Sequence, residues 1–125
     1  LECGFGPLCH LGDAVDYIGK TALRELAATG PQRMLRGIKF GDGPSPPCGE
    51  PFPVTTGPAS RSGGQSSAGR DEIVGQITSG IYSPRLGCNV GMSMIEKTHW
   101  EFGTRLFVHT PDGKTHNGTV EPFPF

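Results

Sequence analysis

Glycine and proline interrupt this sequence so often that its apolar residues occur in short runs. The chain contains 20 glycines and 12 prolines, more than a quarter of its 125 residues. They are spread between the apolar runs as turn residues, and hydrophobic residues make up 34% of the chain. Short runs separated by frequent turns are typical of an all-β domain with a modest core.

The clearest strand signals lie in the second half of the chain. Residues 72–80 form an apolar run in which Gly75 indicates a bend or bulge. Residues 89–95 alternate, which places Val90, Met92 and Met94 on one face of a strand. Pro111-Asp112-Gly113 predicts the turn of a β-hairpin over residues 104–120.

Weaker signals precede them. Residues 34–40 are a strand candidate, and residues 54–56 predict a brief edge strand. Residues 57–70 offer almost nothing to bury, and we expect them to form the most mobile internal loop. About six short strands in some ninety residues favour a small closed barrel over an open sheet. We therefore predict a mainly β fold, a small Greek-key-like six-stranded β-barrel.

A short lead-in precedes the predicted barrel. Residues 1–16 are irregular, whereas Lys20 to Thr29 place apolar side chains at helical spacing. Gly30 and Pro31 then end the helix, since glycine accepts a left-handed backbone and proline cannot continue the helix. The chain begins with Leu1 and no signal peptide, and we interpret it as a piece that lacks an N-terminal portion.

Charge and cysteine content exclude several classes of function. The 11 basic and 12 acidic residues give a net charge of −1, which argues against nucleic-acid and anionic-membrane partners. No apolar run approaches the length of a membrane span. The four cysteines, at positions 3, 9, 48 and 88, match no zinc pattern. We expect free thiols in the cytoplasm and no metal site.

Two constellations have a catalytic and a structural interpretation. Cys9-His10 could form a thiol–imidazole pair, but adjacent residues of an extended segment point to opposite faces. His109 and His116 flank the predicted hairpin turn and are expected to face each other, without a third metal ligand. The structural interpretation is favoured for both pairs.

The most informative stretch is QITSGIYSPRLGCNVG, residues 76–91. Tyr82 and Ser83 place hydroxyls on a turn, and Arg85 adds a fixed cation with planar donors suited to a carboxylate. The same residues also fit a plain barrel corner with a solvated arginine. From these residues alone, both interpretations stay open.

Several motifs resemble one family in the same order along the chain. They are LECGFGPLC at residues 1–9, DYIGKTAL at 16–23, GQITSG at 75–80, YSPRLG at 82–87 and VEPFPF at 120–125. Together they resemble the C-terminal part of the glycine-cleavage T-protein (aminomethyltransferase) family. The resemblance implies that residues 1–31 end a preceding folate-binding domain and that residues 32–125 are the C-terminal barrel.

The resemblance also implies a cofactor and its contacts. Family members use tetrahydrofolate, held in a channel whose reacting groups lie in the N-terminal parts, so we expect no catalytic residue in this chain and no turnover by it alone. The candidate cofactor-binding residues are Glu2, Tyr82, Ser83 and Arg85. The expected partners are folate and a small-molecule methyl donor, and a homodimer is compatible with the resemblance.

Within the family, residues 91–115 with Trp100 resemble the dimethylsulfoniopropionate demethylase branch, which moves a methyl group from a sulfonium compound to tetrahydrofolate. Three alternatives remain. The chain could belong to a glycine-cleavage aminomethyltransferase, or be the folate-binding C-terminal module of a dimethylglycine or sarcosine dehydrogenase. It could also be a structural barrel without a folate role, of the kind shared with translation factors.

Overall fold

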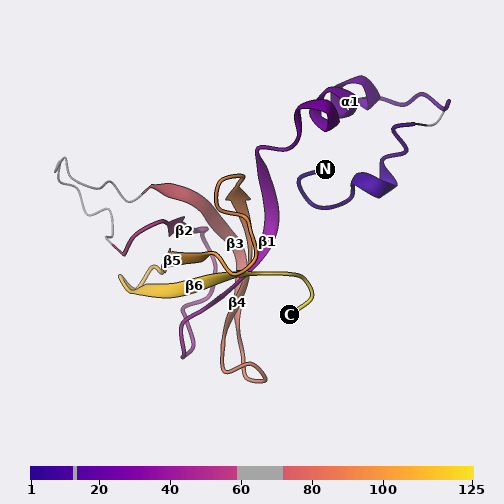
Figure 1. Ribbon diagram of the computed structural model, residues 1–125. Coiled ribbons are helices and arrows are strands. Elements are labelled where there is room, and N and C mark those ends of the chain that lie inside the picture. Colours follow the sequence, from indigo (N-terminus) through magenta and orange to yellow (C-terminus); the bar gives the residue numbers. More distant parts are fainter. Residues whose placement is uncertain (13, 59–71) are drawn as a thin grey trace.

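The computed structural model describes residues 1–12, 14–58 and 72–125, in which a β-barrel follows a separate lead-in (Figure 1). The lead-in contains η1 (Gly6–Leu8) and α1 (Lys20–Thr29). The described strands are β1 (Arg33–Phe40), β2 (Phe52–Thr55), β3 (Ile73–Ser83), β4 (Cys88–Glu96), β5 (Arg105–His109) and β6 (Thr115–Glu121). Most of the predicted loop 57–70 lies outside the described residues.

The strands of the described residues form a closed antiparallel barrel in the order β1-β4-β3-β2-β5-β6. Strands β2, β3 and β4 follow one another through the sheet, and β5 returns to pair with β2, which is a Greek-key connection. Strand β1 closes the barrel between β4 and β6. The prediction of a mainly β, closed six-stranded barrel preceded by a short helix is confirmed for the part of the chain that is described.

Apolar side chains from every strand fill the barrel. The buried core consists of Ile38, Phe40, Phe52, Val54, Val74, Ile77, Ile95, Leu106, Val108 and Val120. The rings of Phe40 and Phe52 meet edge to face, with centroids 6.5 Å apart. This small core explains how a chain with few hydrophobic residues sustains a barrel.

The prediction of an edge strand at residues 54–56 is wrong. Strand β2 pairs with β3 on one side and with β5 on the other, and Val54 is fully buried. Pro53 cannot donate to a sheet ladder, which is why proline is usually confined to edge strands. Barrel closure leaves no edge strand, so even this short segment is enclosed.

Gly75 lies beside an irregularity of β3, as its position in the sequence indicates. Val54 pairs with Gly75, but Thr55 pairs with Ile73, so β3 contains one extra residue at this point. A Cβ atom on Gly75 would lie 2.5 Å from the Met94 carbonyl oxygen of β4. Glycine is therefore needed here because the neighbouring backbone comes too close for any side chain.

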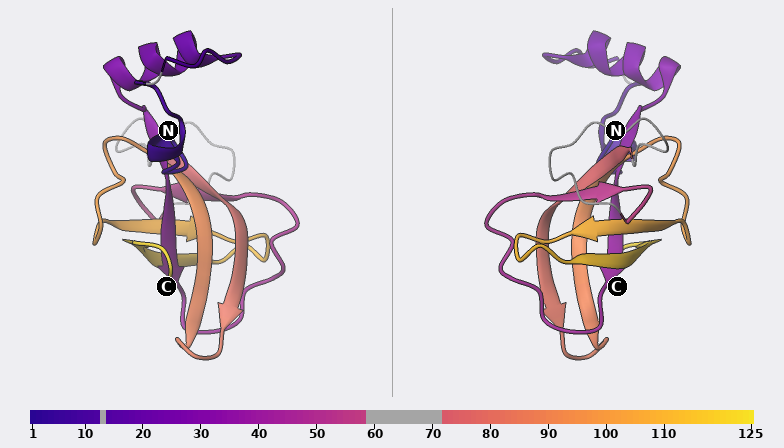
Figure 2. Two further views of the ribbon diagram at one scale, coloured as in Figure 1. Left: turned by 90° about the vertical axis from the view of Figure 1, so that its right-hand side faces the viewer. Right: turned by 90° about the vertical axis from the view of Figure 1, so that its left-hand side faces the viewer.

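The lead-in extends away from the barrel and meets it at one point (Figures 1 and 2). Helix α1 has its predicted bounds and is followed by Gly30. Gly30 has a positive φ of 77°, which glycine adopts without strain at the end of a helix. The backbone N–H of Leu35 donates to the Glu2 carbonyl oxygen at 2.8 Å, which fastens the first residues to β1. Among the described residues no helix is long and apolar enough to cross a membrane.

Candidate functional site

The turn between β3 and β4 carries three of the predicted cofactor-binding residues. Tyr82 and Ser83 end β3 and are half-buried, whereas Arg85 lies in the turn itself and is exposed. The Ser83 carbonyl oxygen accepts hydrogen bonds from the N–H groups of Leu86, at 3.2 Å, and Gly87, at 2.9 Å. Gly87 has a φ of 67°, which a residue with a Cβ atom adopts only with strain. Backbone hydrogen bonds thus fix the turn, and the Arg85 guanidinium is exposed on it. Tyr82 and Ser83 are successive residues of β3, so their side chains point to opposite faces of the strand.

Arg85 also fastens the C-terminal tail. Its Nη2 donates to the Phe125 carbonyl oxygen at 2.9 Å. The Phe125 ring lies over Gly37 of β1, so closely that a Cβ atom there would come within 2.6 Å of it. The ring of Phe123 packs edge to face on Phe125, with centroids 5.3 Å apart. A guanidinium has five N–H donors, so this bond leaves capacity for a further acceptor.

The fourth predicted residue, Glu2, lies in a polar cleft between the lead-in and the barrel. The cleft has a volume of about 320 Å³ and is lined by Glu2, Gln32, Arg33, Glu96, Lys97 and Thr98. Glu2 Oε2 pairs with Arg33 Nε at 3.0 Å, and the side chain of Arg33 is 62% exposed. An ion pair in contact with solvent contributes little to stability, so it leaves the carboxylate free to exchange partners.

The structure does not bring the four predicted residues into one pocket. Glu2 lies where β1 begins, opposite Glu96 at the end of β4. Ser83 pairs with Cys88 at the start of β4. The eight residue steps from Cys88 to Glu96 span about 26 Å of strand at about 3.3 Å per residue. The turn and the polar cleft therefore lie at opposite ends of the barrel.

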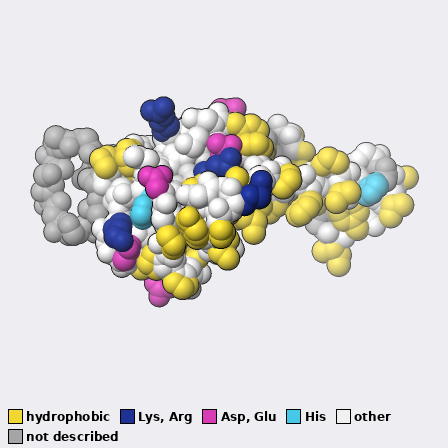
Figure 3. Space-filling model, turned by 90° about the horizontal axis from the view of Figure 1, so that it is seen from below, with side chains coloured by type: hydrophobic (Ala, Val, Ile, Leu, Met, Phe, Trp, Pro, Cys, Tyr) yellow, Lys and Arg dark blue, Asp and Glu magenta, His cyan; other side chains and the backbone are white. Residues whose placement is uncertain are grey.

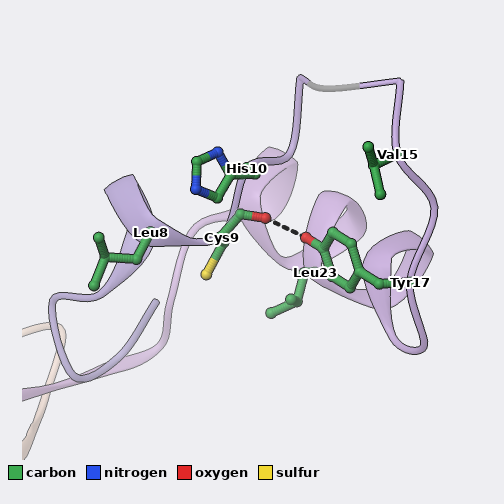
Figure 4. Close-up of a pocket in the computed structure, with 6 residues that line it drawn as sticks. All are labelled: Leu8, Cys9, His10, Val15, Tyr17 and Leu23. Atoms are coloured by element: carbon green, nitrogen blue, oxygen red, sulfur yellow. Dashed lines mark hydrogen bonds between the residues drawn. The ribbon is translucent and has the colours of Figure 1, made fainter.

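A second, apolar hollow of about 460 Å³ lies within the lead-in (Figure 4) and is lined by Leu8, Cys9, His10, Val15, Tyr17 and Leu23. The Tyr17 hydroxyl donates to the Cys9 carbonyl oxygen across it (Figure 4). The Cys9 thiol donates to the Phe5 carbonyl oxygen at 3.4 Å. These contacts agree with the structural interpretation of Cys9. The sequence contained no signal for this hollow, because residues on both sides of an irregular segment create it.

The hairpin of β5 and β6 corrects one prediction. His109 pairs with Thr115 and His116 pairs with Val108, so the two histidines lie on opposite faces and do not meet. His109 Nε2 lies 2.7 Å from Thr55 Oγ1, whereas the His116 ring lies 6.0 Å from that of Phe40. The reason is the five-residue connection between the strands, residues 110–114, which shifts the register by one residue from the expected pairing. Within the described ranges, no cluster of histidine, cysteine and carboxylate residues could hold a metal ion.

The hairpin turn contains the one strongly perturbed carboxyl group among the described residues. The Thr110 hydroxyl donates to Asp112 Oδ1 at 2.5 Å, and Lys114 Nζ lies 3.0 Å from Oδ2. These hydrogen bonds, that of Thr110 first, lower the pKa of Asp112 from 3.8 to about 2. Asp112 fixes the turn and lies apart from both the polar cleft and the β3–β4 turn.

Comparison with known proteins identifies the family. The profile of the glycine cleavage T-protein C-terminal barrel domain matches residues 33–125. The chain is 41% identical over 112 residues, 90% of its length, to the dimethylsulfoniopropionate demethylase DmdA of Ruegeria pomeroyi, of which it covers 26%. It is 34% identical over 108 residues, 86% of its length, to an aminomethyltransferase of Symbiobacterium thermophilum, of which it covers 25%.

A solved structure supports the fold. The crystal structure of glycine cleavage system aminomethyltransferase T from Bartonella henselae superposes with a TM-score of 0.61 at 22% identity, over 85% of this chain and 25% of that one. The chain thus spans about a quarter of the length of these relatives. With its closed barrel and the family profile covering every strand of that barrel, the chain belongs to the glycine cleavage T-protein C-terminal barrel domain family.

Proposed function

We propose that this chain is the C-terminal barrel of a cytoplasmic, tetrahydrofolate-dependent methyltransferase that demethylates dimethylsulfoniopropionate. The observation that carries the proposal is the difference in identity. The chain is 41% identical to the Ruegeria demethylase, against 34% to the Symbiobacterium aminomethyltransferase and 31% to that of a Nostoc species. The resemblance of residues 91–115 to the demethylase branch points in the same direction.

Methyl transfer from a sulfonium requires no catalytic group from the barrel. The methyl group of a sulfonium is already activated, because a neutral thioether leaves when the carbon–sulfur bond breaks. The methyl group would pass to a nitrogen of bound tetrahydrofolate, and the proton of that nitrogen would pass to water or to a base in the preceding region. The enzyme must mainly align the two reactants and exclude water. A rigid barrel that closes one side of a channel supplies that alignment without catalytic groups of its own.

The predicted residues fit the chemical groups of a folate. Arg85 presents planar donors on a rigid turn, which suits the carboxylates of the glutamyl tail. Tyr82 and Ser83, the last two residues of β3, lead into the same turn and carry one hydroxyl on each face of the strand. Glu2 lines the polar cleft and can accept hydrogen bonds from the N–H groups of a ring. Bound tetrahydrofolate would supply the nucleophilic nitrogen that takes the methyl group.

One alternative has an observation in its favour. Aminomethyltransferases match this chain repeatedly at 30% to 34% identity, and several alignments cover 99% or 100% of it. A glycine-cleavage aminomethyltransferase uses the same cofactor with a different one-carbon donor. The barrel chemistry described above is compatible with both donors, so the distinction depends on which preceding region this barrel fits.

An exchange of barrels tests the proposal. The corresponding C-terminal quarter of the Ruegeria demethylase is replaced by this chain, and methyl transfer from dimethylsulfoniopropionate to tetrahydrofolate is measured as methyltetrahydrofolate formed. The same exchange into the Symbiobacterium aminomethyltransferase is the matched control. We expect the demethylase exchange to retain activity within about tenfold of the parent and the control exchange to lose more. The reverse order, with both proteins folded, would assign the barrel to the aminomethyltransferases.

A further inference from the structure

Strand β4 is more apolar on its outer face than on its inner face. Its side chains alternate between buried and accessible positions, as expected for a barrel wall. The inward-facing residues are Asn89, Gly91, Ser93 and Ile95. The outward-facing residues include Val90, Met92 and Met94. A strand with one face in water normally has the opposite pattern, so this outer face is built to be covered.

The neighbouring strands extend the apolar outer face on both sides. Ile81 of β3 pairs with Val90, and Leu35 of β1 pairs with Met94. Ile81 is 71% exposed and Met92 is 43% exposed. We call the surface formed by Leu35, Ile81, Val90, Met92 and Met94 the outer stripe. Figure 3 shows hydrophobic side chains gathered on the barrel and again over the lead-in at the right.

The C-terminal tail borders the outer stripe, of which Ile81 and Met92 are exposed and the other three residues are half-buried. Gly37 pairs with Met92, and the Phe125 ring lies over Gly37. The tail thus covers the β1 side of the stripe at its middle, where Phe123 remains 40% exposed. Methionine side chains are flexible and polarizable, so they adapt to the shape of a partner surface.

The lead-in approaches the barrel at the upper end of this same face. The hydrogen bond from Leu35 N–H to the Glu2 carbonyl oxygen joins it to the stripe's own residue on β1. The left view of Figure 2 shows the start of the lead-in in front of the upper end of β1, and the C-terminus in front of β1 lower down, with β4 and β3 beside it. Phe5 and Leu8 of the lead-in are 63% and 70% exposed. The outer stripe on the barrel and the exposed apolar residues of the lead-in therefore lie on either side of the point where the lead-in joins β1.

We infer that the outer stripe and the exposed apolar residues of the lead-in are the docking surface for the region that precedes this barrel in its relatives. The relatives are about four times as long as the part matched, and the matched domain is described as their C-terminal barrel. Their remaining length therefore lies mainly before it. A polypeptide that enters through the lead-in arrives beside Leu35, at the end of the stripe.

The inference rests on the proposed function only in taking such a preceding region as the partner. Methionine oxidation tests it, because the chain contains three methionines and two of them belong to the stripe. The second protein is the Ruegeria demethylase whose C-terminal quarter is replaced by this chain, called the Ruegeria exchange protein. The isolated chain and this protein are treated with dilute hydrogen peroxide, and sulfoxide at each methionine is followed by mass spectrometry. We expect Met92 to oxidise at least tenfold more slowly in the exchange protein than in the isolated chain.

A charge substitution supplies a second readout. Ile81→Glu should leave the unfolding midpoint of the isolated chain nearly unchanged, since this side chain is exposed there. In the exchange protein it should restore rapid oxidation of Met92. Asn117→Glu adds the same charge to an exposed position on β6, outside the stripe, and should have no effect on oxidation. If the Ruegeria exchange protein does not fold, the Symbiobacterium exchange protein provides the same measurement.

The outcomes separate this inference from the proposed function. Equal oxidation of Met92 in both proteins would overturn the docking surface, even if the exchange protein transfers methyl groups. Protection that appears in the isolated chain and rises with its concentration would assign the stripe to a second copy, and would also overturn the inference. Protection in an exchange protein without demethylase activity would support the docking surface while refuting the proposed function.

Discussion

Asn89 joins the long connection between β1 and β2 to the wall of the barrel, and its removal should destabilise the fold. The side chain is fully buried. Its Nδ2 donates to the carbonyl oxygens of Phe40, at 3.1 Å, and Gly43, at 2.7 Å. Its Oδ1 accepts from the N–H of Ser45 at 3.0 Å. One amide thus satisfies the carbonyl of the last residue of β1 and two backbone groups of the proline-rich connection that follows it.

The expected loss follows from these bonds. A net contribution of about 1 kcal/mol for each hydrogen bond gives about 3 kcal/mol for Asn89→Ala. A domain of this size loses roughly 4 °C in melting temperature for each kcal/mol, so the midpoint should fall by about 12 °C. Asn89→Asp should cost at least as much, because it places an acceptor against the two carbonyl oxygens of Phe40 and Gly43.

Urea and thermal unfolding of the chain, followed by circular dichroism, measure both variants. Ser93→Ala is the matched control, because Ser93 is equally buried on the same strand face and makes one described bond, to the Gln76 carbonyl oxygen at 2.8 Å. It should cost about 1 kcal/mol. An Asn89→Ala variant that is no less stable than Ser93→Ala would refute the reasoning and show that water replaces the amide without loss.

Other predictions concern single residues. Gly75→Ala should cost about 1 to 3 kcal/mol in urea unfolding, because its Cβ would lie 2.5 Å from a carbonyl oxygen of β4; an unchanged midpoint would contradict this close packing. The Asp112 carboxyl should titrate near pH 2 by NMR, and Thr110→Ala should raise that pKa. Since the folded pKa of Asp112 is depressed, its contribution to stability is present above about pH 4 and is lost as the pH falls towards 2, and Asp112→Asn should remove this dependence. In the Ruegeria demethylase that carries this barrel, Arg85→Ala should raise the Michaelis constant for folate with little change in turnover, because the glutamyl tail of folate is bound alike in ground and transition states.

Local signals in the sequence predicted the local structure well. The helix from Lys20 to Thr29 ends at Gly30, and the Pro111 to Gly113 turn joins β5 to β6. Each of these features depends on the residues at that point, namely a left-handed glycine or a turn proline. The closed barrel was also predictable, since many short strands with frequent turns have few other ways to bury their apolar faces.

Features that depend on distant pairing were not predictable in the same way. The alternation of residues 89–95 was visible, but the sequence alone did not show that the apolar set of Val90, Met92 and Met94 faces outward. That choice depends on the register of β4 with β1 and β3. The docking of Phe125 onto Gly37 likewise joins positions far apart in the chain. The edge assignment of residues 54–56 failed for the same reason.

The separation of Glu2 from Arg85 makes the folate proposal testable in one further respect. A ligand that contacts both residues must extend along the barrel, because the two lie at opposite ends of β4. Tetrahydrofolate has a ring at one end and a glutamyl tail at the other, and tails of several glutamates extend it. We expect Glu2→Gln in the exchange enzyme to raise the Michaelis constant for mono- and triglutamate forms alike, since both carry the same ring.

Arg85→Ala should affect the triglutamate form more than the monoglutamate form, because only a longer tail brings additional carboxylates to the turn. A partly exposed, charge-assisted contact of this kind contributes about 1 kcal/mol, or about fivefold in the Michaelis constant. Phe125→Ala is the control for indirect effects, since it disturbs the tail that Arg85 holds and leaves the guanidinium in place. If Arg85→Ala and Phe125→Ala shift the constants for both forms equally, Arg85 acts by fastening the C-terminal tail and the turn makes no contact with folate.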